Sequence, residues 1–144
     1  MSFNKQKSDQ IAQDLLKYKF EKAGRGPDKL DCLGVIIFYF KEFGIEIPDY
    51  SAIKDWGEYD EEYVKAIPKI LRKLEPDEKL ERGDVIVFRN TQELTGNLNH
   101  AGIFLGKSEF IHAGVKIGIT INKIYQKPWK DRIYGYFRVR ESEK

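Results

Sequence analysis

Cysteine is almost absent from this chain: Cys32 is the only one among 144 residues. A single cysteine cannot close an internal disulfide, so the sequence carries no mark of an oxidising compartment. Long apolar runs are also missing, since none reaches the roughly 18–20 residues that cross a bilayer. The first ten residues, "MSFNKQKSDQ", hold no hydrophobic stretch. We therefore expect no signal peptide, no membrane insertion and synthesis in the cytoplasm.

Net charge is low as well. Lysine and arginine number 25 and aspartate and glutamate 23, which leaves a formal charge of +2. A balance this even argues against a nucleic-acid partner, because a nucleic-acid surface needs a clustered basic stripe. The chain does contain 41% hydrophobic residues, which is enough for one packed core. Its length predicts a single domain over residues 1–144, with residues 1–7 as a flexible arm.

The first half of the chain is predicted to be helical. Apolar residues at helical spacing predict a helix over residues 8–18, capped by Ser8 or Asp9. A second helix is predicted over residues 31–44, and a third within residues 59–73.

The second half contains short runs rich in Ile, Val, Phe and Tyr, separated by turn residues. The predicted strands cover residues 84–89, 100–106, 109–114, 118–124 and 133–140. The gaps between them are too short for the helices that connect parallel strands, so the strands should pair as antiparallel hairpins. Helices followed by an antiparallel sheet of about five strands indicate an α+β fold.

Histidine is scarce too, and the only two, His100 and His112, lie near the ends of adjacent predicted strands. If the chain turns around Gly106 and Lys107, both fall on paired strands at nearly equal distance from the turn. Cross-strand neighbours have Cβ atoms about 4.5–5.5 Å apart, and diagonal ones about 7–8 Å. The pair can be structural, can belong to a metal site, or can be a general base with an orienting partner. No carboxylate or second cysteine converges on it, so we expect neither a metal nor another cofactor.

Cys32 has two interpretations. A lone cysteine beside an apolar run is typical of an inert core thiol. Cys32 also stands in the first turn of the second predicted helix, where unpaired N–H groups and the helix dipole stabilise a thiolate. The spacing of the two histidines favours the second interpretation, in which the thiol is a nucleophile. Asp31, just before it, is predicted to cap the helix.

Four motifs together resemble those of the NlpC family of papain-like cysteine peptidases, which cut bacterial cell-wall peptides. The motifs are "DCLG" at 31–34, "RGDVIVF" at 82–88, "HAGIFLG" at 100–106 and "FIHA" at 110–113. The segment "WKDRIYGYFR" at 129–138 is similar to the closing strand of the family. The resemblance implies a papain-like fold, in which the nucleophile begins a central helix that packs on the sheet.

The resemblance also implies roles for individual residues. Cys32 would be the nucleophile, His100 the general base and His112 the residue that orients His100. Many relatives place a tyrosine hydroxyl near the nucleophile, where this chain has Phe20. Tyr18, two residues earlier, is the residue that would have to supply that hydroxyl.

The implied substrate is a peptidoglycan stem peptide, cut after γ-linked D-glutamate. Asp31 has a second implied role here, as a contact for the free amine of that peptide. Three aromatic residues of the middle segment, Trp56, Tyr59 and Tyr63, can wall the substrate groove or can simply pack.

A closer resemblance is to the bacteriophage tail-associated branch of the family. It rests on "FEKAGR" at 20–25, "FGIEIPDYS" at 43–51 and the bulky Leu33 after the cysteine. It implies phage tail proteins as partners, and either a place in the virion or delivery to the cell wall by a phage or prophage. Two alternatives stay open: a non-catalytic structural or assembly component of a phage tail with the same fold, or an amidase or acyltransferase of the same superfamily.

Overall fold

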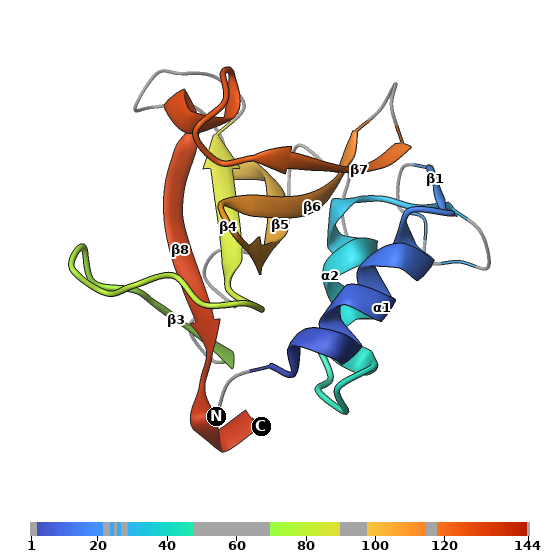
Figure 1. The fold of residues 1–144 in the computed structure, drawn as a ribbon, viewed down its shortest axis with the longest axis horizontal. Coiled ribbons are helices and arrows are strands. Elements are labelled where there is room, and N and C mark those ends of the chain that lie inside the picture. The colour runs from blue at the N-terminus through green and yellow to red at the C-terminus, as the bar shows by residue number, and fades with distance from the viewer. Residues whose placement is uncertain are drawn as a thin grey trace.

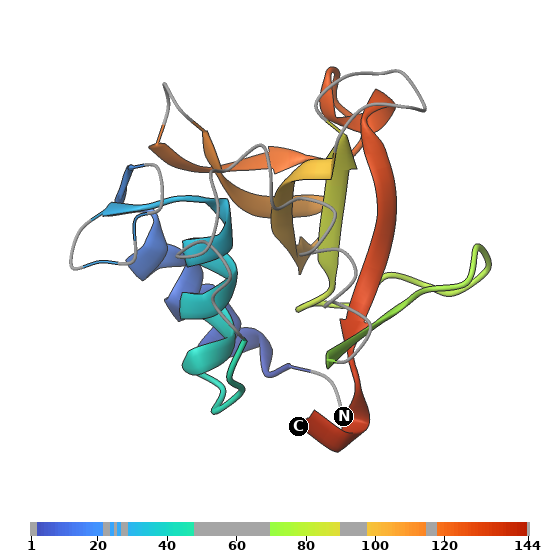
Figure 2. The same cartoon turned by 180° about the vertical axis from the view of Figure 1, so that it is seen from behind.

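The computed structural model describes residues 3–21, 24, 26, 29–47, 70–89, 98–114 and 118–143. Most of the third predicted helix, and the aromatic residues Trp56, Tyr59 and Tyr63, lie outside these ranges. Figures 1 and 2 show two helices on one side of a curved sheet, with the edge strand β3 and its neighbour β8 on the side away from them.

Six strands form this sheet in the order β3-β8-β4-β5-β6-β7, and every neighbouring pair is antiparallel. The strands are β3 (Leu71–Lys73), β4 (Val85–Arg89), β5 (Leu98–Gly106), β6 (Glu109–Gly114), β7 (Gly118–Lys123) and β8 (Ile133–Val139). The predicted α+β class and antiparallel pairing are therefore confirmed. Residues 71–73, the last part of the range within which the third helix was predicted, form a strand and not a helix. Leu71 pairs with Val139 instead, and this gives the sheet a sixth strand.

Shorter elements flank these strands. Two short strands, β1 (Lys19–Phe20) and β2 (Lys29–Leu30), pair in parallel ahead of the second helix. Two 3-10 helices, η1 (Trp129–Asp131) and η2 (Glu141–Glu143), precede and follow β8.

The first helix, α1 (Lys5–Leu15), begins three residues earlier than predicted. Its cap is Asn4, whose side-chain oxygen accepts a hydrogen bond from the backbone N–H of Lys7 at 2.9 Å. The predicted caps Ser8 and Asp9 are therefore wrong, because both residues lie inside the helix.

The predicted N-terminal arm is also wrong from Phe3 onward. Phe3 is buried, and its ring centroid lies 4.7 Å from that of Phe43. Ser8 is buried as well, and its hydroxyl forms a 2.8 Å hydrogen bond with the hydroxyl of Tyr39. These contacts hold α1 against the helix that follows it.

The second helix, α2 (Cys32–Lys41), begins where the sequence predicts. Asp31 has an extended backbone, and its Oδ1 accepts a hydrogen bond from the N–H of Gly34 at 2.7 Å. The predicted N-cap is thus confirmed. The helix is apolar on nearly all sides because it packs against α1 and against the strands β5 and β6.

The sheet is buried on both faces. On one face, side chains such as Val87, Ile103 and Ile111 join those of the two helices in the main core. On the other face a smaller cluster forms around Phe88 and Phe110. Alternation along β5 and β6 therefore sends neighbouring residues into two different apolar environments.

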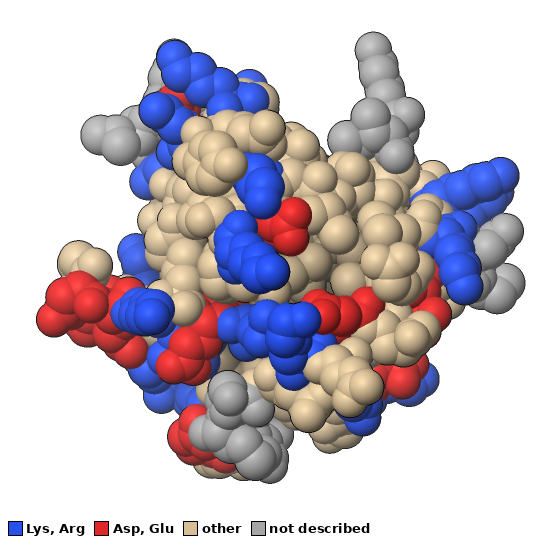
Figure 3. Space-filling view, viewed as in Figure 1, with Lys and Arg blue, Asp and Glu red and all other residues tan. Residues whose placement is uncertain are grey.

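Charges of both signs are mixed on the face seen in Figure 3, and neither sign forms a continuous patch there. Within the described ranges, neither helix has the length and apolar character that a membrane crossing requires.

Candidate active site

The two histidines are carried by the β5–β6 hairpin. A two-residue turn at Lys107 and Ser108, both with positive φ, joins the strands. The register pairs Gly102 with His112, so His100 lies diagonal to His112. The predicted hairpin is confirmed, and the diagonal arrangement is one of the two that the spacing allows.

The imidazole side chains bridge the diagonal offset. His100 Nε2 lies 2.8 Å from His112 Nδ1, and the two ring planes are nearly perpendicular, at 85°. One of these nitrogens must donate the proton and the other accept it. The residue bonded to the other ring nitrogen of His112 decides which of the two donates.

That partner is Asn122 on β7, whose Oδ1 lies 2.8 Å from His112 Nε2. An amide oxygen can only accept, so His112 carries its proton on Nε2. His112 Nδ1 is then an acceptor, and His100 donates to it from Nε2. His100 is left with an unprotonated Nδ1, which is the atom a general base needs.

Aromatic rings enclose the two imidazoles. Trp129 stacks on His100 with ring centroids 5.5 Å apart, and it meets His112 edge-to-face at 4.6 Å. Phe88 contacts His100, and Phe110 contacts His112. Solvent is therefore largely excluded from the hydrogen-bonded chain.

This burial sets the protonation state of the pair. It lowers the pKa of His100 from 6.5 to about 3, and the nearby charges of His112 and Arg132 act in the same direction. Burial also lowers the pKa of His112 to about 4, although the hydrogen bond that His112 donates to Asn122 opposes the shift. Both histidines are consequently neutral at neutral pH.

Cys32 is the first residue of α2 and is only 4% exposed. It belongs to the main core with Ala101 and Ala113, on the face of the sheet that α2 covers. Strand alternation turns the preceding residues, His100 and His112, to the opposite face, where they contact Phe88, Phe110 and Trp129. Figure 1 shows that the N-terminal end of α2 is the end nearer β6 and β7. The helix therefore packs directly on the two strands that carry the histidines, while the imidazoles lie on the other face of those strands.

Packing explains the residues around Cys32. A Cβ atom at Gly34 would lie 2.5 Å from the carbonyl oxygen of Gly24, so only glycine fits where the preceding loop crosses the helix. Asp31 and Leu33 are both buried at this crossing. The role of Asp31 as a helix cap is established by its hydrogen bond, and its contact with a substrate amine stays a prediction.

Tyr18 and Phe20 lie at β1, beside the start of β7. The ring of Tyr18 packs 5.3 Å from that of Phe38, and both Tyr18 and Phe20 are partly buried against the main core. A Cβ atom at Gly118 would lie 3.7 Å from the carbonyl oxygen of Tyr18, which shows how closely β1 approaches β7. Their predicted part in substrate binding stays a prediction.

A family model described as the NlpC/P60 family matches residues 17–138. The chain belongs to the NlpC/P60 family. It is 29% identical over 133 residues to a gamma-DL-glutamyl hydrolase of Bacillus subtilis (strain 168), covering 89% of this chain and 28% of that protein. It is 28% identical over 126 residues to the murein DD-endopeptidase MepS/murein LD-carboxypeptidase of Escherichia coli (strain K12), covering 86% and 56%. This NlpC/P60 chain therefore spans between about a quarter and just over half of the length of these relatives.

Solved structures agree on the fold. An NlpC/P60 family protein from Bacillus cereus gives a TM-score of 0.71 at 19% identity, covering 96% of this chain and 41% of that one. The P60 domain of antigen MAP1204 from M. avium subspecies paratuberculosis gives 0.58 at 18% identity, covering 92% and 91%. The predicted papain-like arrangement of helices and antiparallel sheet in this NlpC/P60 chain is confirmed.

Two residues beside the histidines, Asn122 and Trp129, do not appear among the residues predicted for the site. Asn122 is a polar residue in the strand "GITINK", and its diagonal position from His112 is the signal that could have identified it. Trp129 falls in the segment 129–138 that resembles a closing strand. The strand begins only at Ile133, and Trp129 starts η1 instead. Over the described part of the chain, no three His, Cys, Asp or Glu residues are grouped to hold a metal ion.

Proposed function

We propose that this NlpC/P60 chain is a cysteine peptidase that hydrolyses the γ-D-glutamyl–diamino acid bond of peptidoglycan stem peptides. Cys32 is the nucleophile, His100 the general base and His112 the residue that orients it. The observation that carries the proposal is the hydrogen-bonded chain from Asn122 through His112 to His100, since it leaves His100 Nδ1 ready to take a proton. The names of the relatives, a gamma-DL-glutamyl hydrolase and a murein endopeptidase, support the substrate class.

The reaction has two stages. His100 Nδ1 takes the thiol proton of Cys32 while the sulfur attacks the scissile carbonyl, and the same proton passes to the leaving amine as the C–N bond breaks. The product of this stage is a thioester. Water then attacks the thioester with His100 again as base, which releases the carboxylic acid and restores the thiol. The backbone N–H of Cys32 would be one oxyanion donor, and such a donor is typically worth about 10²–10³ in rate.

The neutral histidine pair gives this mechanism a specific electrostatic character. His112 holds the His100 ring but carries no negative charge, so it stabilises the transient imidazolium less than a carboxylate would. The low pKa of His100, about 3, keeps its Nδ1 unprotonated well below pH 6.5. The acid limb of kcat/KM should therefore lie below the ordinary histidine range.

Digestion of purified murein by the wild-type protein and by Cys32→Ala tests the proposal. Mass spectrometry should detect fragments cut after γ-linked D-glutamate with the wild type and none with the variant. Iodoacetamide should label Cys32 in the folded protein, and a thiol that reacts only after unfolding would contradict its role. Fragments that indicate a different amide bond would instead support the amidase or acyltransferase alternative.

We also propose, on sequence motifs alone, that the protein is of the bacteriophage tail-associated type. The motif "FEKAGR" at 20–25 and the buried Leu33 support this assignment. Mass spectrometry of purified particles from the induced host should then detect the chain in tail fractions. Its absence from particles, together with murein hydrolysis by the free protein, would remove the phage assignment and leave the peptidase intact.

A further inference from the structure

Arg132 lies next to the histidine chain but has no part in the mechanism described above. It follows η1 directly, and its backbone N–H donates to the carbonyl of Trp129 at 2.9 Å. Its own carbonyl accepts from the N–H of Arg89 at 2.7 Å, at the end of β4. The residue is therefore fixed between the indole that covers the histidines and the strand that carries Phe88, a neighbour of His100.

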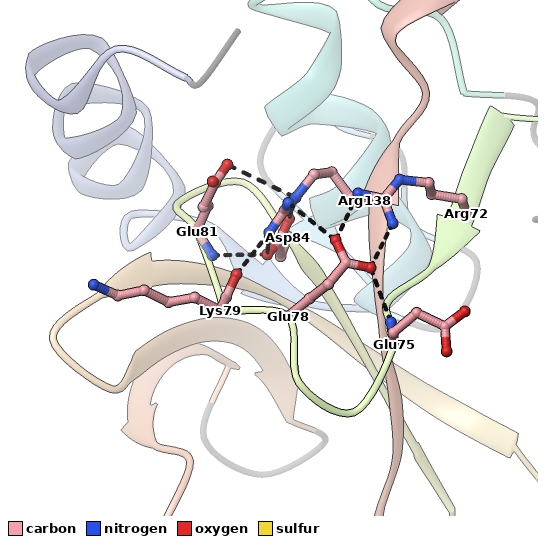
Figure 4. A network of polar contacts seen from close by, with 7 residues as sticks. All are labelled: Arg72, Glu75, Glu78, Lys79, Glu81, Asp84 and Arg138. Atoms are coloured by element: carbon pink, nitrogen blue, oxygen red, sulfur yellow. Dashed lines mark hydrogen bonds and ion pairs between the residues drawn. The ribbon is translucent and has the colours of Figure 1, made fainter.

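The guanidinium of Arg132 differs from those of the other arginines whose contacts the structure describes. Its Nε is the one buried side-chain polar atom without a hydrogen-bond partner in the described ranges. By contrast, Arg72 and Arg138 each make paired hydrogen bonds to a carboxylate (Figure 4), and Arg89 donates to a backbone carbonyl. A buried donor without a partner is costly, and it marks a place where a ligand can supply the missing acceptor. Arg132 as a whole is partly exposed, so a ligand can reach it.

The charge of Arg132 also acts on the general base. It lowers the pKa of His100, which means that it disfavours the imidazolium that the proposed mechanism must form. An anion that pairs with Arg132 would remove this opposition at the moment when His100 takes the proton. The same contact would therefore bind a substrate and support its turnover.

We propose that Arg132 binds a carboxylate that the substrate carries next to the scissile amide. This inference rests on the proposed function, because it names a recognition element of the same site. A guanidinium suits a carboxylate through two parallel charge-assisted hydrogen bonds. The substrate offers two sources: the α-carboxylate that a γ-linkage leaves free on the glutamyl residue, and the side-chain carboxylate of a leaving diaminopimelate.

Three synthetic peptides distinguish these sources. The first carries both carboxylates, the second has the glutamyl α-carboxylate as a carboxamide, and the third has lysine in place of diaminopimelate. Loss of the recognised carboxylate should lower the wild-type kcat/KM about tenfold or more, as expected for a charged hydrogen-bonded pair. Arg132→Gln should abolish this preference. On the peptide that lacks the recognised carboxylate, its turnover should equal or exceed that of the wild type. Arg132→Lys should keep part of the preference, because it retains the charge without the planar fork.

Lys130→Gln is the matched control. Lys130 is an exposed cation of the same 3-10 helix, and its substitution changes the net charge equally. It should leave the preference unchanged, and thermal melting should show that every variant is folded.

The outcomes separate the inference from the function on which it rests. Equal rates on all three peptides, or a preference that survives in Arg132→Gln, would overturn the role of Arg132 and leave the peptidase intact. If the wild type cleaves none of them, the proposed function fails, and calorimetric binding of the same peptides to Cys32→Ala decides the recognition question. Carboxylate-dependent binding that Arg132→Gln removes would support the site, and equal binding of all three peptides would overturn it.

Discussion

The sheet carries two polar networks that differ in charge, burial and chemistry. The histidine chain on β5, β6 and β7 is neutral and is held by two hydrogen bonds of 2.8 Å. The other network is ionic and joins β3, β8 and the segment before β4 (Figure 4). In it, Arg138 makes two 2.8 Å hydrogen bonds to Asp84, and Arg72 makes two of 2.7 and 2.8 Å to Glu78.

The difference follows from access to water. In the ionic network the side chain of Asp84 is 2% exposed but that of Glu78 is 27% exposed, so one end of the cluster reaches solvent and its charges persist. The histidines lie under Trp129, where a charge would be expensive. The ionic network can therefore hold strands together, while the neutral network fixes the tautomer that leaves His100 Nδ1 unprotonated.

Acidification should break the histidine network first. The folded-state pKa values of His100 and His112, about 3 and 4, lie below the 6.5 of an unfolded histidine. Above that value neither state is charged; below it the unfolded chain binds protons that the folded chain does not. The free energy of unfolding should then fall by about 1.4 kcal/mol per pH unit for each histidine, until the folded pKa is reached.

Urea unfolding between about pH 7 and about pH 4.5 measures this slope. His100→Gln should make it shallower, since one titrating group is gone. Glu78 does not affect the slope in this pH range. Its hydrogen bonds with Arg72 and with the backbone N–H of Glu75 lower its pKa from 4.5 to about 2, so the stability that these bonds give is lost only below pH 4.5. A stability profile that is flat down to pH 4.5 would contradict the neutral pair.

Arg138→Leu should break the ionic network without touching catalysis. It leaves the carboxylate of Asp84 buried without its guanidinium partner, a change that typically costs about 3 kcal/mol or more. Chemical unfolding gives the loss, and kcat on a γ-glutamyl peptide should stay at the wild-type value where the variant is folded. Adding Asp84→Asn to Arg138→Leu should recover part of the stability; a double variant no more stable than the single one would argue against the buried charge as the cause.

Asn122 tests whether the neutral chain controls the proton position. Asn122→Leu removes the acceptor of His112 Nε2–H and should lower kcat about tenfold, in line with the cost of a buried unsatisfied group. Asn122→Asp keeps an acceptor and adds a negative charge, so it should raise the histidine pKa values and move the acid limb of kcat/KM upward. Nitrogen-15 NMR of the imidazoles reads the tautomers directly. If the His100 tautomer is unchanged in Asn122→Leu, Asn122 does not control the proton position and only packs against His112.

The smallest effect should come from the exposed end of the ionic network. Glu78→Gln removes the partner of Arg72, and because Glu78 is partly exposed to solvent the expected loss of stability is smaller than that of Arg138→Leu. Raising the salt concentration to about 1 M should shrink the difference between the variant and the wild type further. The kinetic constants of the histidine site should not respond to the substitution.

The parts of the site that the sequence predicted are those that depend on local geometry. The turn at Lys107 and Ser108 connects β5 to β6 directly, so the spacing of His100 and His112 was enough to place them together. Asp31 could be identified as a cap because capping involves neighbours in the chain.

The parts that escaped prediction depend on distant partners. β3 is only three residues long, and its pairing with β8 joins Leu71 to Val139, far along the chain. The burial of Phe3 depends on its packing against Phe43. The residues next to Phe3 in the sequence do not predict that contact. Trp129 covers the histidines only because η1 folds back over the sheet, so its residue type alone gave no indication of that contact.

The tight turn of the β5–β6 hairpin has a consequence for which changes in length this chain can accept. A single residue inserted at Lys107 and Ser108 would shift the strand register by one, and a shift by one reverses the face to which every side chain points. His112 would then exchange places with its neighbours Ile111 or Ala113 and lose contact with His100. Substitutions that suit positive φ are tolerable at this turn, but insertions and deletions are not, so its length should be invariant wherever the activity is retained.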